Sequence, residues 1–283
     1  MRYLELRKKI EEMFEKNGID EFADIDWIMV EILGVGRSML PFYGDINGDK
    51  EHQIMEAAKK RIERVPVAYI FKRTNFYGYD LKVNESVLIP RLDTEVLVEK
   101  IVEDIKSQPQ KVSVLDIGTG SGAIIIAIQK ETNAKCFAVD VSRAALEIAA
   151  ENAKTNKAEV EFVKSDLFEK IQDLKVDYIV SNPPYIETEV VKCLEPEVVS
   201  NEPILALDGG EDGLDFYRKI IKAAKYHLNK NGKLYFEIGY NQGIAVSELM
   251  KQDFEDIEVI KDYGGNDRVV RGKLKGNILW LKN

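Results

Sequence analysis

One short run of residues carries the groups needed to hold a planar NH₂ group. The run is Ser181-Asn182-Pro183-Pro184-Tyr185. Its two prolines fix φ and lack an N–H, so the carbonyls nearby stay free to accept hydrogen bonds from a ligand. The side-chain oxygen of Asn182 and the carbonyl of Pro183 can take two N–H bonds while Tyr185 covers the flat face. We expect this segment to present a planar nitrogen for reaction; the alternative is a rigid loop after a strand.

A glycine-rich turn precedes this segment in the chain. It reads Asp116-Ile117-Gly118-Thr119-Gly120-Ser121-Gly122, after an apolar strand and before an apolar helix. Glycines permit a tight turn and let a ligand approach the backbone closely. The spacing fits neither the G-x-G-x-x-G turn of dinucleotide enzymes nor a phosphate-binding loop. Asp116 would repel a pyrophosphate, so the turn favours a cationic group.

Two later strand ends carry further polar residues. Asp140 can accept hydrogen bonds from both hydroxyls of a ribose, and Asp166 from an adenine amino group. Leu167 or Phe168 would then cover the adenine ring. Each residue alone can be a turn or cap, but ligands of open α/β sheets bind at such successive strand ends. A cationic group, a ribose and an adenine together predict S-adenosylmethionine as the cofactor, and we expect Asn182 to contact it too.

The elements that must position these residues alternate between strands and helices. Strands are expected over 112–117, 135–140, 160–164, 176–181, 232–239, 256–261 and 267–274, and helices from 94 and over 122–131, 142–155, 213–229 and 242–252. This alternation predicts an α/β fold with a mostly parallel sheet covered on both faces. No helix separates the last two strands, so we expect one of them to run antiparallel at the sheet edge.

The first part of the chain has a different pattern. Apolar residues recur at helical spacing in three stretches, 6–14, 25–33 and 54–65, which predicts a small helical bundle. An aromatic, glycine-broken stretch over 74–83 then predicts a β-hairpin. We therefore expect a helical substrate-docking domain over 1–68, a β-hairpin linker over 69–90 and a catalytic domain over 91–283. Simple packing is the alternative role for the bundle.

Composition excludes several classes of function. The chain has 283 residues and a net charge of −9, which argues against a phosphate backbone as partner. No apolar run approaches the ~20 residues of a membrane helix, and the charged N-terminus lacks a signal-peptide core. Two cysteines, Cys136 and Cys193, with His52 and His227, suit neither a disulfide framework nor the usual metal cluster. We expect a cytoplasmic protein without a metal, and a monomer.

At this point the chain resembles a known family, the glutamine N5-methyltransferases of peptide-chain release factors (the HemK/PrmC type). The resemblance runs in order from residue 64 to 270. Its segments are Arg64-Val65-Pro66-Val67-Ala68-Tyr69-Ile70, Leu88-Ile89-Pro90-Arg91-Leu92-Asp93-Thr94-Glu95, the glycine turn, Ser181 to Tyr185, Glu202-Pro203 through Leu207-Asp208-Gly209-Gly210-Glu211-Asp212-Gly213-Leu214, and Asp267-Arg268-Val269-Val270. Leu92 and Asp93 stand where the family usually has Pro and Glu.

The resemblance implies a class I S-adenosylmethionine-dependent methyltransferase. Its fold would be a Rossmann-like, mostly parallel seven-stranded sheet with an N-terminal helical bundle and a β-hairpin linker. The implied substrate is the Gln side chain in the Gly-Gly-Gln loop of class-1 release factors. The acceptor segment alone also fits a DNA adenine or RNA guanine amino group, or a Gln of a ribosomal protein. Against a nucleobase stand the acidic balance and the lack of a basic cluster. A binding module without activity is a further alternative.

Several other polar residues have two interpretations. Arg91, Thr94 and Glu95 either shape a lid over the cofactor or form a helix cap and a surface ion pair. Residues 186–212 make a long, acidic connection, and such connections are often substrate clamps or lids. Glu237 ends a predicted strand near the site, where it either touches the substrate or serves as a structural hydrogen-bond partner.

Overall fold

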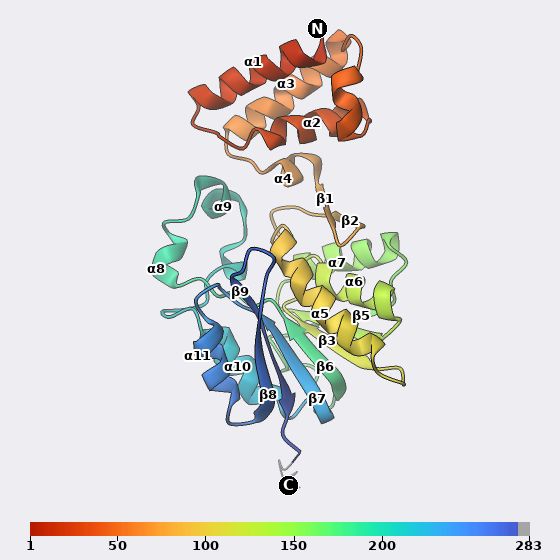
Figure 1. Ribbon diagram of the computed structural model, residues 1–283, viewed down its shortest axis with the longest axis vertical. Coiled ribbons are helices and arrows are strands. Elements are labelled where there is room, and N and C mark those ends of the chain that lie inside the picture. The colour runs from red at the N-terminus through yellow and green to blue at the C-terminus, as the bar shows by residue number, and fades with distance from the viewer. Residues whose placement is uncertain (277–283) are drawn as a thin grey trace. The chain divides into compact units, whose positions relative to one another are not determined.

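The computed structural model describes residues 1–276 and divides into two compact units (Figure 1). One unit comprises Met1–Arg73 together with Glu195–Asn201. The other comprises Thr74–Leu194 and the described residues from Glu202 onward. The sequence pattern contained no signal that residues 195–201 group with the N-terminal helices.

The first unit is a helical bundle. Its long helices are α1 (Tyr3–Lys16), α2 (Ala23–Leu33) and α3 (Gly48–Ile62), which are the helices that the apolar stripes predict. Gly34 ends α2 with φ 71°, a left-handed cap that glycine adopts without strain. The 3₁₀ helix η1 (Arg37–Phe42) and the short α4 (Val67–Phe71) were not predicted.

The short helix α9 (Pro196–Asn201) belongs to this unit and is held by polar contacts. The buried guanidinium of Arg61 donates to Glu197 at 3.0 Å. The Asn201 side chain donates to the backbone oxygen of Arg64 at 3.0 Å. A segment that is remote in sequence is therefore fastened to α3 and the turn after it.

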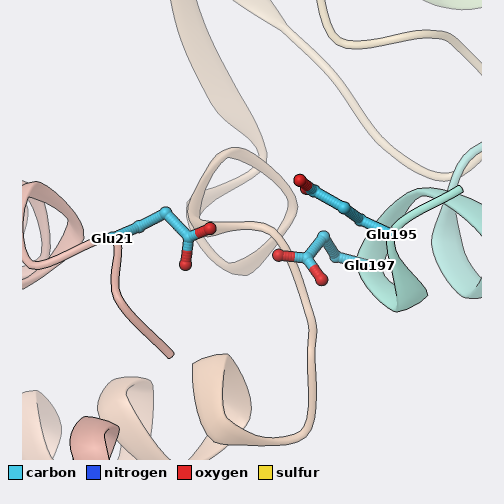
Figure 2. Close-up of side chains that lie close together, drawn as sticks. All are labelled: Glu21, Glu195 and Glu197. Carbon is cyan, nitrogen blue, oxygen red and sulfur yellow. The ribbon is translucent and has the colours of Figure 1, made fainter. Parts of the chain in front are cut away.

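Three carboxylates of this unit come together in the described part of the chain. Oxygens of Glu21, Glu195 and Glu197 lie within 4.8 Å of one another (Figure 2). Arg61 donates to Glu21 and to Glu197, each at 3.0 Å. Because Arg61 pairs with two of the three carboxylates, we interpret the cluster as part of an ion-pair network, and it gives no argument for a metal site.

The second unit contains a seven-stranded sheet among the described residues. Its strands are β3 (Ser113–Ile117), β4 (Lys135–Asp140), β5 (Val160–Lys164), β6 (Val176–Ser181), β7 (Leu228–Glu237), β8 (Phe254–Lys261) and β9 (Asp267–Leu274). They lie in the order β5-β4-β3-β6-β7-β9-β8. The chain starts in the middle, at β3, and the direction of strand addition reverses there, which creates a ligand-binding switch point.

The sequence prediction about the antiparallel strand was partly wrong. One strand, β9, does run antiparallel, but it pairs with β7 on one side and β8 on the other. It therefore lies inside the sheet, and β8 forms the edge. The helix between β7 and β8 carries the chain past one strand position, so β8 runs parallel to β7, and β9 returns as a hairpin into the gap.

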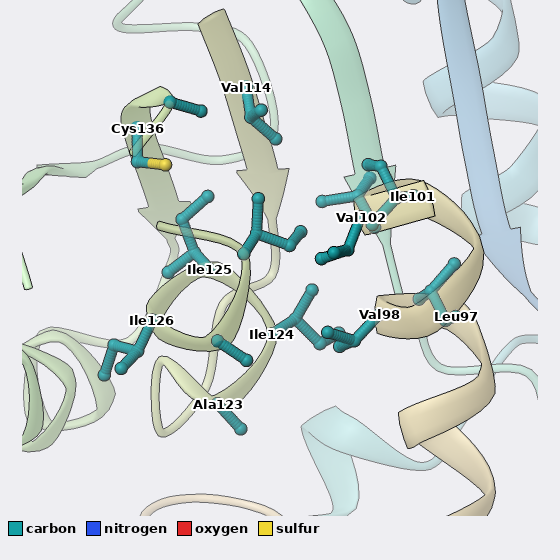
Figure 3. Close-up of a cluster of buried hydrophobic side chains, with 14 of the residues drawn as sticks. Leu97, Val98, Ile101, Val102, Val114, Ala123, Ile124, Ile125, Ile126 and Cys136 are labelled. Atoms are coloured by element: carbon teal, nitrogen blue, oxygen red, sulfur yellow. The ribbon is translucent and has the colours of Figure 1, made fainter. Parts of the chain in front are cut away.

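Helices cover both faces of the sheet (Figure 1). One face carries α5 (Glu95–Lys106), α6 (Ala123–Thr132) and α7 (Arg143–Thr155), and the other carries α10 (Asp215–Ala224) and α11 (Gly243–Met250). Figure 3 shows side chains of α5 and α6 in one buried cluster with Val114 and Cys136 of the sheet. The first six residues of α6, Ala123–Ile128, are all apolar, and Ile125 and Ile126 are fully buried, which reflects the position of this helix between the sheet and α5.

Several element boundaries differ from the sequence prediction. β7 begins at Leu228 and α10 ends at Ala224, so the helix is shorter than expected. The stretch 186–212 contains the short helices α8 (Thr188–Val191), α9 and η3 (Ile204–Ala206). The predicted hairpin is present as β1 (Arg73–Phe76) and β2 (Tyr79–Lys82).

The hairpin turn is made by two residues with left-handed backbones. Tyr77 has φ 53° and Gly78 has φ 80°, as a two-residue turn matched to strand twist requires.

Within residues 1–276, every helix is too short or too polar to cross a lipid bilayer.

The packing of α6 against the sheet gives a stability prediction. Ile125 is 0% exposed, so Ile125→Ala should lower the free energy of unfolding by about 2–5 kcal/mol through lost burial and a cavity. Val190→Ala, at a 45% exposed site, should change it by only about 0.5 kcal/mol. Denaturant titration followed by circular dichroism measures both. Equal effects of the two substitutions would contradict the packing described here.

Candidate active site

The site begins with the pairing of two neighbouring strands. β3 and β6 run parallel, with Ile117 opposite Ser181 at their carboxyl ends. The buried hydroxyl of Ser181 donates to the backbone oxygen of Ile117 at 2.7 Å. The glycine turn starts at the next residue of one strand, and Asn182 is the next residue of the other. Sheet pairing therefore places the two predicted functional segments side by side.

A cavity of about 190 Å³ opens at this edge of the sheet. Most of the residues predicted from sequence line it. They are Gly118, Thr119, Gly120, Ser121, Asp140, Asp166, Leu167, Asn182, Pro183 and Pro184. Arg91 and Thr94 contribute to the wall from the segment before α5, and Pro203 and Leu205 from the long connection. The proposed cofactor residues and the proposed acceptor segment thus share one cavity.

Four predicted residues do not line the cavity. Asp116 lies behind the glycine turn, fully buried. Gly122 opens α6 with φ 81°, and a Cβ there would lie 3.2 Å from the Cβ of Ala149, so this glycine serves helix packing. Phe168 stacks on His227 with ring centroids 4.4 Å apart and belongs to the core. On sequence grounds, Leu167 or Phe168 covers an adenine ring, and of these two residues Leu167 lines the cavity. Tyr185 is the fourth.

Asp116 is the most strongly perturbed acid of the cofactor side. One oxygen accepts from the Thr119 hydroxyl at 2.7 Å, and the other, Oδ1, has no partner among the described residues. Burial raises the pKa of Asp116 to about 7, although the bond from Thr119 opposes the shift. An unpaired buried carboxylate oxygen favours a cationic ligand, which fits S-adenosylmethionine.

Asp140 links the glycine turn to α7. Its two oxygens accept from the backbone N–H groups of Gly120 and Ser142, at 2.9 and 2.8 Å. Burial raises the pKa of this carboxyl, and the backbone bonds oppose the rise. Each carboxylate oxygen has a second lone pair, so Asp140 can hold the turn and still accept from a diol. Both interpretations of Asp140, structural and ligand-binding, are compatible with this geometry.

Leu167 has an unusual backbone for its type. Its φ is 46°, in the left-handed region that a branched side chain rarely adopts. Such strain is often retained at ligand sites. Leu167 lines the cavity beside Asp166, which suits the role of a cover for a flat ring.

The acceptor segment is held by hydrogen bonds on its far side. The Asn182 Nδ2 atom donates to the Thr94 hydroxyl at 3.4 Å. The Tyr185 hydroxyl donates to Glu237 at 3.5 Å, and the Tyr185 carbonyl accepts from Gln242 at 3.0 Å. Burial raises the pKa of Tyr185 to about 12. Tyr185 is therefore fixed against the core, and its predicted role of covering a substrate remains a proposal.

The Gly-Gly-x-Asp-Gly-Leu segment supports the acceptor segment from behind. The Ile186 N–H donates to Leu207 at 3.0 Å, and the Gly209 N–H donates to Ile186 at 2.8 Å. A Cβ at Gly209 would lie 2.8 Å from the carbonyl oxygen of Pro184, and one at Gly213 would collide with the carbonyl of Tyr185. These glycines allow two backbones to lie closer together than side chains permit.

An ion pair joins two segments of the cavity wall. Arg91 donates to both oxygens of Glu202, at 2.6 and 2.8 Å. Burial raises the pKa of Glu202, and Arg91 opposes the rise. Pro203 and Leu205, just after Glu202, line the cavity. Glu95, grouped with Arg91 on sequence grounds, instead accepts from the Tyr77 N–H at 2.7 Å and holds the hairpin turn.

Two supporting residues were missed in the sequence. Asn152 of α7 is 1% exposed, and its amide donates to the Ser121 and Lys82 carbonyls, each at 2.9 Å. Gln242 donates to Tyr185 and to Gly213, at 3.0 and 3.2 Å. In a sequence, an Asn or Gln in an amphipathic helix or a loop cannot be distinguished from an exposed polar residue. The burial of Asn152 and Gln242 in the structure is what reveals their supporting role.

The fold and the cavity define the class of protein: a class I methyltransferase that uses S-adenosylmethionine. Solved structures share the fold. A methyltransferase from Pyrococcus furiosus aligns over 70% of this chain and 90% of its own, with a TM-score of 0.53 and 22% identity. A 16S rRNA N2 methyltransferase of T. thermophilus, in complex with AdoMet and guanosine, aligns over 72% of this chain and 50% of its own, with a TM-score of 0.52 and 16% identity.

Sequence comparison then identifies the family. Residues 5–71 match the PrmC N-terminal domain, and residues 91–195 match the methyltransferase small domain. A release factor glutamine methyltransferase of Fusobacterium nucleatum is 40% identical over 278 residues, covering 95% of this chain and 78% of the relative. That of Bacillus anthracis is 38% identical over 284 residues, covering 97% and 100%. The chain belongs to the release factor glutamine methyltransferase family.

The buried acid behind the turn gives a pH prediction. Ionised Asp116 favours a cation, and its pKa is about 7. Affinity for S-adenosylmethionine should therefore fall as the pH drops through about 7, by up to about tenfold per unit below the pKa. Asp116→Asn should weaken binding and flatten this dependence, whereas the exposed Asp173→Asn should change neither. Isothermal titration calorimetry measures both. A steep dependence retained in Asp116→Asn would contradict the assignment.

Proposed function

We propose that this chain transfers a methyl group from S-adenosylmethionine to the side-chain amide nitrogen, N5, of the Gln in the Gly-Gly-Gln loop of class-1 peptide chain release factors. The observation that carries the proposal is the shared cavity, where Asn182 and Pro183 lie beside the turn Gly118–Ser121. Membership of the release factor glutamine methyltransferase family favours a protein amide over a nucleobase as the substrate.

An amide nitrogen reacts poorly because its lone pair is delocalised into the carbonyl group. The chain must therefore orient the nitrogen and remove its water. We assign the Asn182 side-chain oxygen and the Pro183 carbonyl as acceptors for the two N–H bonds. Among the described residues, the hydrogen bond of the Asn182 carboxamide is the donation from Nδ2 to Thr94, which leaves the side-chain oxygen available for a substrate. Alignment at reacting distance can contribute up to about 7–11 kcal/mol.

When bound, S-adenosylmethionine supplies an electrophilic methyl group on a sulfonium. The residues proposed to hold it are Asp116, Asp140, Asp166 and Leu167 with the glycine turn. The cavity presents mostly apolar groups around these acids, such as Ile117. Exclusion of water there strengthens the electrostatic contacts that favour transfer between a cation and a neutral amide.

The helical unit is proposed to dock the release factor, with a boundary near residue 68 and the linker over 69–90. The connection 186–212 is proposed to act as a clamp, because Pro203 and Leu205 line the cavity while α9 belongs to the helical unit. We also infer that the enzyme works as a monomer in the cytoplasm, without a nucleic-acid partner, consistent with its net charge of −9.

A labelling experiment tests the substrate. Purified enzyme receives methyl-labelled S-adenosylmethionine and a mixture of release factor, DNA, ribosomal RNA and ribosomal proteins. Mass spectrometry of the digested release factor should locate the label on the Gln of its Gly-Gly-Gln peptide. A release factor with that Gln replaced should remain unlabelled. Label in a nucleic acid or a ribosomal protein, with none in this peptide, would overturn the proposal.

The orienting role of Asn182 has its own test. Asn182→Ala removes one acceptor, so kcat on release factor should fall on the order of a hundredfold. Affinity for S-adenosylmethionine should change far less. Gln252→Ala removes an exposed carboxamide from a turn before β8 and should leave turnover unchanged. Steady-state kinetics and calorimetry separate the two quantities. Near-normal turnover in Asn182→Ala would show that the orientation role is wrong.

A further inference from the structure

The charged side chains around the cavity are unevenly divided between the two signs. Asp140 and Asp166 line it, and Asp116 lies behind the glycine turn. Among the described residues, Arg91 is the one basic side chain on the cavity wall. The acids suit the positive groups and the hydroxyls of S-adenosylmethionine, but the methionine end of this cofactor also carries an α-carboxylate. An anion held among acids needs a positive partner, which the acids cannot supply.

The guanidinium of Arg91 has N–H groups available for such an anion. The Arg91 side chain is 46% exposed. Its hydrogen bonds among the described residues both leave from Nη2, to the two oxygens of Glu202 at 2.6 and 2.8 Å. A guanidinium has five N–H donors, so the donors on Nε and Nη1 are left for a ligand. Arg91 can therefore bind a second carboxylate while it keeps the first.

Glu202 is the buried member of this ion pair. Its side chain is 1% exposed, in contrast to the accessible side chain of Arg91. The positive end of the pair is therefore the end that a molecule in the cavity meets. The two hydrogen bonds from Nη2 also restrict the guanidinium, which lowers the entropy lost when a ligand binds to it. A contact that only joins two wall segments does not require this asymmetry.

The order of the strand ends indicates which end of the cofactor reaches Arg91. In the sheet order β5-β4-β3-β6, Asp166 follows β5, Asp140 ends β4 and Asn182 follows β6. Adenine at Asp166 and ribose at Asp140 direct the methionine end toward β3 and β6. The Thr94 hydroxyl accepts from Asn182 at 3.4 Å, and the Thr94 N–H donates to the Arg91 carbonyl at 3.1 Å. Arg91 therefore belongs to the segment at the methionine end of the cavity.

We propose that Arg91 binds the α-carboxylate of S-adenosylmethionine and that Glu202 holds the guanidinium in place for it. The inference rests on the proposed cofactor site, because the assigned acids determine which way the cofactor lies. It adds a positive contact to that site. Arg91 is a binding residue in this account, Glu202 acts through it, and neither takes part in the transfer of the methyl group.

Two ligands that differ by one carboxylate test the proposal. Isothermal titration calorimetry measures the affinity of S-adenosylmethionine and of its decarboxylated analogue, which keeps the sulfonium, the amine and the nucleoside. Wild-type enzyme should prefer the carboxylated ligand by roughly tenfold to a hundredfold, the range of a charge-assisted hydrogen bond. Arg91→Gln should lose most of this preference, with S-adenosylmethionine weakened by that factor and the analogue by less than about twofold.

Two further variants separate carboxylate binding from wall packing and from general charge. Glu202→Gln breaks the ion pair but keeps the positive charge of Arg91, so most of the preference for S-adenosylmethionine should remain. The control is Arg143 of α7, which pairs with Glu147 at 3.2 Å, is 82% exposed and lies outside the cavity lining. Arg143→Gln should change the affinity of either ligand by less than about twofold.

The fold of Arg91→Gln needs its own check, because this variant leaves the buried Glu202 carboxylate without its partner. Thermal unfolding shows whether the protein still folds. If it does not, the combination of Arg91→Gln with Glu202→Gln removes the whole pair and leaves no uncompensated buried charge. This double variant should show the same loss of preference between the two ligands.

Two results would overturn the proposal. One is wild-type enzyme that binds both ligands with equal affinity. The other is an equal loss of affinity for both ligands in Arg91→Gln, which would mean that Arg91 acts through the shape of the wall. Wild-type enzyme that binds neither ligand would refute the proposed cofactor site itself. These titrations contain no release factor, so they do not depend on the proposed substrate.

Discussion

The site depends on one pairing in the sheet, that of β3 with β6. Ile117 and Ser181 lie opposite each other, and the Ser181 hydroxyl donates to the Ile117 carbonyl at 2.7 Å. Parallel strands end at the same edge, so the next residues of both strands emerge together. The glycine turn and the Asn-Pro-Pro-Tyr segment owe their proximity to this register. A shift by one residue would turn their side chains to opposite faces.

Near this pairing, the protein contains buried carboxylic acids that lower the stability of the folded state. Asp116 and Glu237 each have a carboxylate oxygen without a partner among the described residues, and burial raises the pKa of both to about 7. Such groups cost stability. One lies behind the turn and the other behind the acceptor segment, so the cost falls on the two walls where charge and orientation matter most for methyl transfer.

Much of the fold and of the cavity could be predicted from the sequence, because the functional loops contain residue types with distinctive backbone preferences. Glycines 118, 120 and 122 mark backbone positions with positive φ, and two prolines mark the acceptor loop. Long-range packing was not predictable in this way. Phe168 reads as a ring cover but stacks on His227, and Asn152 reads as a surface amide but is buried. The insertion of β9 between β7 and β8 also depends on a crossover that no local pattern records.

The central claim is that Asn182 and Pro183 accept the two N–H bonds of a glutamine amide. A crystal structure of the enzyme with S-adenosylhomocysteine and a release factor tests it most directly. We expect the Gln nitrogen at about 2.7–3.2 Å from both the Asn182 side-chain oxygen and the Pro183 carbonyl oxygen. A Gln amide held by other groups, or an Asn182 whose NH₂ faces the substrate, would contradict it.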